Sequence, residues 1–115
     1  MPALSIDALF DTAAKIQVLE EKNLGLVFSP EGISIRFPTT RRLAEYLGVP
    51  HYYVLPFFAS MEQEELVTRA ERIGILTTQK GTEKFMRIIL ERYRYEAEEI
   101  LGQDILEHIS QKIKY

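Results

Sequence analysis

The side chains most able to do chemistry in this 115-residue chain are the cations of its central segment. Residues 36–80 contain six basic and five acidic side chains, a net charge of +1, whereas residues 1–35 have a net charge of −3. Each arginine or lysine can neutralise one phosphate and release its counterions, so a cluster of them suits a nucleic-acid backbone. The whole chain carries a net charge of −3, which disfavours nucleic acid, but attraction depends on the local patch as well as on the total. For any single arginine the alternative is ordinary surface charge, such as Arg72 paired with Glu71 or Glu65.

Catalytic chemistry has little support in the sequence. The chain has no cysteine, and its two histidines, His51 and His108, show no metal-ligand spacing with each other or with an acidic cluster. The six glycines are scattered, so none of them builds a phosphate-binding loop. We therefore expect no catalytic residue, no metal site and no cofactor, and hence a protein that is not an enzyme.

Two helices joined by a tight turn must position the central cations. Leu43 and Leu47 are four residues apart and share one helical face, and Thr39 or Thr40 can cap the start of their helix. Gly48 can adopt the left-handed conformation that ends a helix, and a second helix follows at once, over residues 51–64. This order is that of a helix-turn-helix unit.

Short strands are expected on both sides of this unit. Residues 66–70 and 73–77 read as a strand and its return strand, with a charged tip between them. A first helix over residues 5–22 is followed by β-like segments 26–28 and 33–37, which a Ser-Pro-Glu-Gly turn joins into a hairpin. The sequence thus predicts a mainly α fold with a small β component (α+β).

A long helix is expected after Gly81, with a stripe of apolar residues spaced alternately by four and three. The stripe can pack against the first helix, or it can form the seam of a homodimer. Further apolar residues off the stripe favour both contacts, so we expect a homodimer built by residues 82–115. Gly102 interrupts the pattern, and Ile105, Ile109 and Ile113 continue it as a shorter stripe. The predicted dimerisation residues are Met86, Leu90, Tyr93, Ala97 and Ile100.

The order of short motifs in the centre of the chain resembles that of a known superfamily. The motifs are a Leu-Ala-x-x-Leu-Gly-Val helix end, a Leu-Val strand, a charged hairpin and a Leu-Thr-x-x-x-Gly segment that opens the next helix. They are carried by Leu43, Ala44, Leu47, Gly48, Val49, Leu66, Val67, Leu76, Thr77 and Gly81. In this respect the chain resembles the winged helix-turn-helix transcription regulators, most closely the MarR- and PadR-like kind. The resemblance implies a winged helix-turn-helix domain, here with an extra N-terminal hairpin and a long C-terminal helix.

The resemblance also implies a function, that of a DNA-binding transcription regulator acting on double-stranded DNA. The helix over residues 51–64 would enter the major groove and the wing would lie on the backbone and reach the minor groove. The residues implied for base contacts are His51, Tyr52, Tyr53 and Leu55. Those implied for phosphate contacts, on the helix start and the wing, are Arg41, Arg42, Arg69, Arg72 and Lys80.

Pro56 departs from this pattern and keeps an alternative open. A proline beyond the first helical turn removes an internal hydrogen bond, so the helix must kink there or begin later, near Tyr53. The aromatic side chains of this helix could instead bind a protein, which would make the chain a winged-helix interaction module without DNA binding. A third hypothesis is a ligand-gated regulator with an aromatic pocket between the first helix and the C-terminal helices.

The sequence contains no charged-then-apolar leader and no long uncharged apolar run. We therefore expect a soluble, cytoplasmic protein with a single domain over residues 1–115 and no membrane partner.

Overall fold

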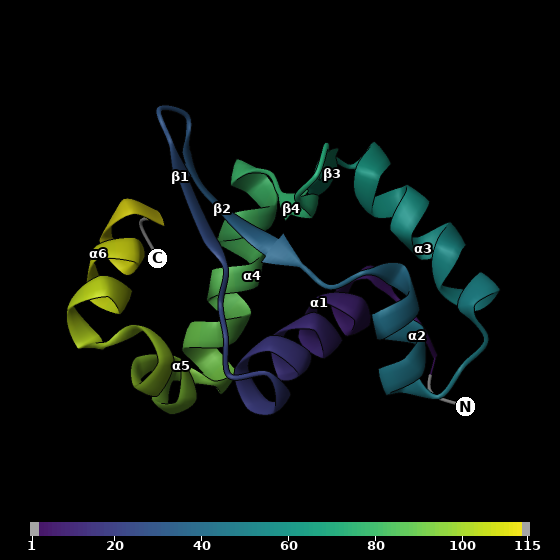
Figure 1. The fold of residues 1–115 in the computed structure, drawn as a ribbon, viewed down its shortest axis with the longest axis horizontal. Coiled ribbons are helices and arrows are strands. Elements are labelled where there is room, and N and C mark those ends of the chain that lie inside the picture. The colour runs from purple at the N-terminus through teal and green to yellow at the C-terminus, as the bar shows by residue number, and fades with distance from the viewer. Residues whose placement is uncertain (1–2, 114–115) are drawn as a thin grey trace.

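The computed structural model describes residues 3–113, except for the side chain of Ile113, and within them the chain forms an α+β domain (Figure 1). This confirms the predicted fold class. In chain order the helices and strands are α1 (Ile6–Ala14), the π-helical segment η1 (Lys15–Glu20), β1 (Leu26–Ser29), β2 (Gly32–Phe37), α2 (Thr40–Leu47), α3 (His51–Gln63), β3 (Val67–Ala70), β4 (Gly74–Thr77), α4 (Gln79–Arg92), α5 (Arg94–Leu101) and α6 (Gln103–Ile113).

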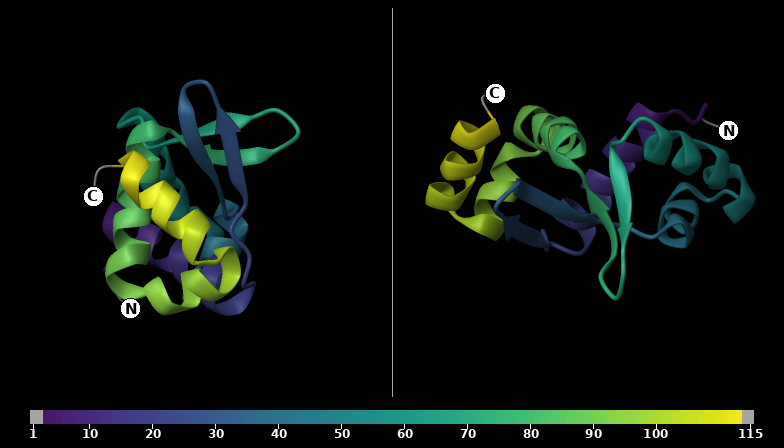
Figure 2. Two further views of the ribbon diagram at one scale, coloured as in Figure 1. Left: turned by 90° about the vertical axis from the view of Figure 1, so that its left-hand side faces the viewer. Right: turned by 90° about the horizontal axis from the view of Figure 1, so that it is seen from above.

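The sheet is four-stranded and antiparallel, with the order β1-β2-β4-β3. Strand β2 belongs to two ladders: Ile35 lies opposite Leu26 of β1, and farther along the strand Arg36 and Phe37 lie opposite Leu76 and Ile75 of β4. Both predicted hairpins are therefore confirmed, and β2 joins them into one sheet. The β3–β4 hairpin projects from the body in both views of Figure 2.

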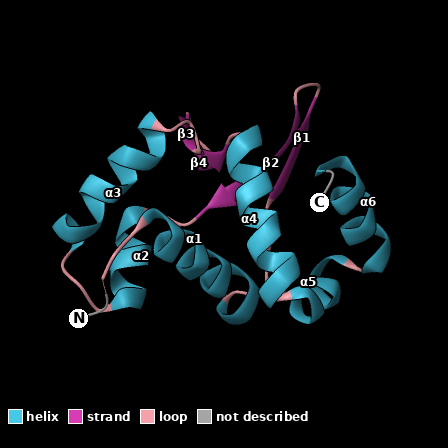
Figure 3. Cartoon of the chain, turned by 180° about the vertical axis from the view of Figure 1, so that it is seen from behind, coloured by secondary structure: helices cyan, strands magenta, loops and turns pink. Residues whose placement is uncertain are grey.

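The core lies between α4, the sheet and the helices of the N-terminal half. Helix α4 packs on β2 and β4, and α1 contacts α2, α3 and α4, as seen from behind in Figure 3. At the centre the rings of Phe10, Phe37 and Phe85 meet in tilted and edge-to-face contacts, with centroids 5.1–6.1 Å apart. Each such ring pair adds roughly 0.5–1.5 kcal/mol beyond its area burial, so α1, β2 and α4 are held together at one point.

The turn between α2 and α3 forms as expected. Thr39 caps α2, because its hydroxyl accepts a hydrogen bond from the Arg42 amide at 3.1 Å. Gly48 ends the helix with a φ of 68°. Helix α3 begins at His51 and contains Pro56, so a later start near Tyr53 is not what occurs. Because proline lacks an N–H, the Tyr52 carbonyl loses its helical partner four residues on.

Two helices are shorter than the sequence predicts. The segment expected as one helix over residues 5–22 is α1 followed by η1, where the Glu21 amide donates to the Ile16 carbonyl five residues back, at 2.8 Å. The expected long C-terminal helix is wrong: the chain leaves helical geometry at Tyr93, with φ −132° and ψ 28°, and again at Gly102. No helix in residues 3–113 is long and apolar enough to cross a membrane.

Candidate functional site

Helix α3 presents its first turn to solvent on one side and to the core on the other. Val54, Phe58 and Met61 are buried. On the opposite side Tyr52 is 64% exposed and Leu55 is 41% exposed. Three of the four side chains predicted to contact bases, those of Tyr52, Tyr53 and Leu55, are thus accessible, and the rings of Tyr52 and Tyr53 touch edge to face with centroids 4.8 Å apart.

His51, the fourth of these residues, has a different environment. Its Nε2 lies 2.6 Å from the Thr40 hydroxyl, and the contact is partly buried. The imidazole therefore joins the first turn of α3 to the first turn of α2, whatever its tautomer. We infer a structural role for His51, because its Nε2 already has a partner inside the molecule.

The outward face of α3 is apolar rather than cationic. Tyr52, Leu55, Pro56 and Ala59 are exposed at helical spacing, and the only ionisable groups of the helix besides the tyrosines are His51 and Glu62. Hydrogen bonding along this face must come mainly from the tyrosine hydroxyls near its start. Any strong positive potential must come from neighbouring segments.

Those segments are the start of α2 and the β3–β4 hairpin. Arg41 is exposed and forms no hydrogen bond or ion pair with any residue that the structure describes. Arg42, by contrast, donates from Nη2 to Glu20 at 2.5 Å and lies 3.7 Å from Glu21 through Nε. This hydrogen bond to Glu20 is the main reason that the Arg42 pKa is raised. Of the two, Arg41 is the free cation.

The β3–β4 hairpin carries the other free cation. Arg72 is exposed at its tip, has a φ of 69°, and has no partner among residues 3–113. Its turn is closed by the Ile73 amide, which donates to the Ala70 carbonyl at 3.2 Å. Arg36 of β2 donates to the Ile73 carbonyl at 3.1 Å and so ties the hairpin to the sheet.

Arg69 and Lys80 lie beside the acidic end of α3. Arg69 Nε is 3.5 Å from the Glu62 carboxylate, and its guanidinium stands 4.9 Å from the centroid of the Phe58 ring, although the side chain stays 65% exposed. Lys80 Nζ donates to the Glu64 carbonyl at 3.2 Å. The five predicted cations therefore fall into two classes: Arg41 and Arg72 are unpaired, and the other three have partners.

The predicted dimerisation stripe is used within the single chain. Met86 and Ala97 are fully buried, Leu90 is nearly so, and Tyr93 and Ile100 pack against the same core. Of the two uses that the sequence left open, packing inside the monomer applies, and these residues leave no exposed seam. Homodimerisation stays a prediction and needs another surface.

Tyr93 also explains where α4 ends. Its hydroxyl donates to Asp11 Oδ1 at 2.9 Å, and Arg92 donates to the same oxygen at 3.0 Å, so the junction of α4 and α5 is anchored to α1. The space between α1 and α4, expected as an aromatic pocket, is filled there by Phe10 and Phe85.

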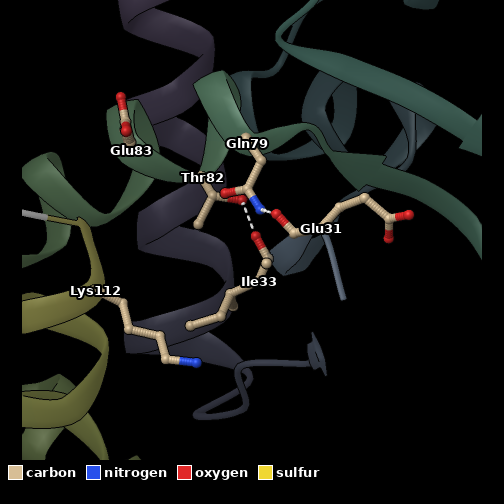
Figure 4. A pocket seen from close by; sticks show the side chains of 7 residues that line it. Glu31, Ile33, Gln79, Thr82, Glu83 and Lys112 are labelled. Atoms are coloured by element: carbon tan, nitrogen blue, oxygen red, sulfur yellow. Dashed lines mark hydrogen bonds between the residues drawn. The ribbon is translucent and has the colours of Figure 1, made fainter. Parts of the chain in front are cut away.

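The described part of the chain also contains several cavities. One, of about 200 Å³, lies where the β1–β2 turn, α4 and Lys112 of α6 meet (Figure 4). Two of its polar side chains are already bonded: Thr82 donates to the Ile33 carbonyl at 2.7 Å, and Gln79 donates to the Glu31 carbonyl. We infer that these hydrogen bonds attach the β1–β2 hairpin to α4.

The second cavity, of about 390 Å³, lies between η1, the start of α2 and the turn end of the β3–β4 hairpin, where Ile73 and Gly74 line it. Gln17 and Arg36 line it, and sequence reasoning missed both as functional candidates, since a single glutamine or strand arginine has no distinguishing spacing. In residues 3–113 no group of three or more histidine, aspartate or glutamate side chains could hold a metal ion.

Comparison of the chain with protein-family models, curated proteins and solved structures finds no match.

Proposed function

We propose that this chain is a winged-helix protein that binds double-stranded DNA through α2, α3 and the β3–β4 hairpin. The order of its elements supports the proposal. Helices α1, α2 and α3 contact one another, β2 lies between α1 and α2 in sequence, and β4 lies between β2 and β3 in the sheet. This order of elements is the one expected of a helix-turn-helix unit with a wing, and in this proposal β1 is an additional strand of the sheet.

The observation that carries the proposal is the conformation of Arg72. A non-glycine residue with a left-handed backbone costs roughly 1–2 kcal/mol, which glycine at the same place would avoid. The side chain recovers none of this cost through a contact in the described part of the chain. An unpaired arginine at the tip of a projecting hairpin is well placed for a phosphate or a minor groove, and its charge gives a reason for the residue type.

In this proposal α3 enters the major groove and the free cations hold the backbone. The hydroxyls of Tyr52 and Tyr53 donate to phosphates or base edges, and Leu55 packs on a thymine methyl group. Arg41 and Arg72 contact phosphates on either side. The carboxylates at the end of α3 must point away from the duplex, so we expect modest affinity that depends steeply on salt.

The test is a salt titration of duplex binding by fluorescence anisotropy, with DNA from upstream of the protein's own operon. Replacing Arg41 and Arg72 together by alanine should weaken binding to all duplexes about equally and lower the slope of log K against log salt by about 1.8, from ~0.9 per phosphate contact. Arg94→Ala is the matched control, because Arg94 is exposed on α5, at the opposite end of the molecule from α3 (Figure 1). If the parent protein binds no duplex even at low salt, the proposal fails.

A second candidate function is protein binding by α3, and the apolar outward face of this helix favours it. Tyr52 and Leu55 give this face large exposed apolar side chains with no cation among them, which is typical of a protein interface and unusual beside DNA. The same variants separate the two functions. Tyr52→Ala should change sequence preference if α3 reads bases, whereas a protein partner would lose affinity for Tyr52→Ala and keep it for the arginine double variant.

A further inference from the structure

The cavity of about 390 Å³ at the turn end of the β3–β4 hairpin is framed by segments that are far apart in the sequence. Phe37 at the end of β2, Pro38 directly after it and Ile75 of β4 are buried and line it with apolar surface. Charged side chains at its edge include Arg36 and Glu21. Its volume of about 390 Å³ lies in the range of small-molecule sites, which combine apolar walls with a few polar groups.

Gln17, which lines this cavity, has an unsatisfied hydrogen-bond acceptor. Its side chain is only 6% exposed, and its Nε2 donates to the Arg36 carbonyl at 2.5 Å. Its Oε1 is the one buried side-chain polar atom in residues 3–113 that has no hydrogen-bond partner. Leaving a buried acceptor unsatisfied costs roughly 1–3 kcal/mol, so a donor supplied at this wall would be stabilising.

The backbone that carries Gln17 is itself unusual. Residues Lys15–Glu20 form a π-helical segment directly after α1. Such segments are rare and occur frequently at functional sites, because the wider turn changes the direction of the side chains that it carries. Gln17 thus combines an uncommon backbone with an unsatisfied amide.

The two arginines that line the cavity differ in their ion pairs. Arg42 is neutralised by Glu20 and Glu21, whereas Arg36 forms no ion pair with a carboxylate of the described residues and donates only to the Ile73 carbonyl. The lining of the cavity therefore contains one cation without an ion pair, the Glu21 carboxylate, and Gln17, whose buried Oε1 has no hydrogen-bond partner. A molecule that matches this lining has a carboxylate and an N–H donor.

We propose that this cavity binds a small zwitterion of the α-amino-acid class, with its carboxylate on Arg36 and its ammonium group donating to Gln17 and Glu21. The apolar wall at Phe37 and Ile75 receives the side chain of the ligand. Arg36 also donates a hydrogen bond to the Ile73 carbonyl of the β3–β4 turn, so binding of the ligand changes the contact that attaches this hairpin to β2. An effect on DNA affinity follows only if the function proposed above is correct.

The test is made on the protein alone, without DNA, so that it stands or falls separately from duplex binding. Each standard L-amino acid is added at millimolar concentration, the Tm is followed by scanning fluorimetry, and hits are titrated by calorimetry. We expect at least one amino acid to raise the Tm saturably, since a ligand that binds only the folded state stabilises it by mass action. Its N-acetyl derivative and its α-amide should each bind at least tenfold more weakly.

Two variants identify the site. Gln17→Leu and Arg36→Met should each weaken the same amino acid at least tenfold, and Arg94→Met, a distant exposed arginine, should leave its affinity unchanged. Because Arg36 is exposed, Arg36→Met keeps the test decisive even if Gln17→Leu does not fold. The proposal is overturned if no amino acid shifts the Tm, if the capped derivatives bind equally well, or if Arg36→Met binds as tightly as the parent.

Discussion

Gly81 is the residue whose replacement tests most directly how α4 packs against the base of the β3–β4 hairpin. It is buried in the first turn of α4, and a Cβ added to it would lie 1.8 Å from the Leu66 carbonyl oxygen and 3.2 Å from the Thr77 Cβ. The same oxygen accepts a hydrogen bond from the Thr78 amide at 3.1 Å. Gly81→Ala must therefore push apart the start of α4 and the loop that leads into β3.

The magnitude follows from this overlap. Cβ atoms essentially never come within 3.0 Å of another heavy atom, so the backbone must move by more than 1 Å, from 1.8 to at least 3.0 Å. Overpacking costs roughly 1–3 kcal/mol, and losing the bond from Thr78 to Leu66 adds about 1 kcal/mol. We expect Gly81→Ala to lower the free energy of unfolding by ~2–4 kcal/mol, which corresponds to a fall in Tm of roughly 8–16 °C for a domain of this size.

Gly48→Ala is the matched control, measured with the parent by urea denaturation. Gly48 has open space around its Cβ position and a φ of 68°, so alanine there meets only backbone strain of ~1 kcal/mol. If Gly81→Ala proves no more destabilising than Gly48→Ala, the packing of α4 against the Leu66 carbonyl is wrong.

Three further predictions concern charge, pH and the buried stripe. Arg72→Gly should change the free energy of unfolding by only ~0 to +1 kcal/mol, because relief of left-handed strain is largely offset by the greater conformational entropy of glycine in the unfolded chain. Duplex binding should weaken. A clear loss of stability in urea denaturation would contradict the left-handed conformation of this turn residue. Burial of Asp11 opposes its ionisation, but hydrogen bonds from Tyr93 and Arg92 outweigh this effect and lower its pKa below 3.8. The contribution of Asp11 to stability is therefore present above about pH 4 and is lost as the pH falls further. Asp11→Asn should make the free energy of unfolding depend less on pH in the acid range, and an unchanged pH dependence would count against this hydrogen-bonded cluster. Met86→Ala should cost ~2–5 kcal/mol with a Tm independent of protein concentration, whereas a Tm that rises with concentration would restore the stripe as a dimer seam.

Features set by near neighbours in the chain are the ones that sequence reasoning predicted. The cap at Thr39, the left-handed end at Gly48 and both hairpins each depend on a few adjacent residues, and each occurs within a residue or two of its expected position. The exposed side of α3 was also predictable in part, since the buried positions Val54 and Met61 follow its apolar periodicity.

Features that depend on distant partners were missed. The break at Tyr93 coincides with an anchor on Asp11, and the stripe that includes Met86 looks the same in sequence whether it faces its own core or a second copy. The π-helical segment and the unsatisfied amide of Gln17 leave no pattern at all in the spacing of residues.

By itself the sequence determined where the helices and strands begin and end around the turn, which side of α3 is buried, and which residues are cationic. Only the tertiary structure decided which cations remain free. Arg42 is paired with Glu20 from η1 and Arg69 with Glu62 from α3, while Arg41 and Arg72 have no such partner within residues 3–113. The physical reason is range: caps, turns and periodicity act over one or two helical turns of chain, whereas ion pairs depend on which segments the folded core brings within about 4 Å of each other.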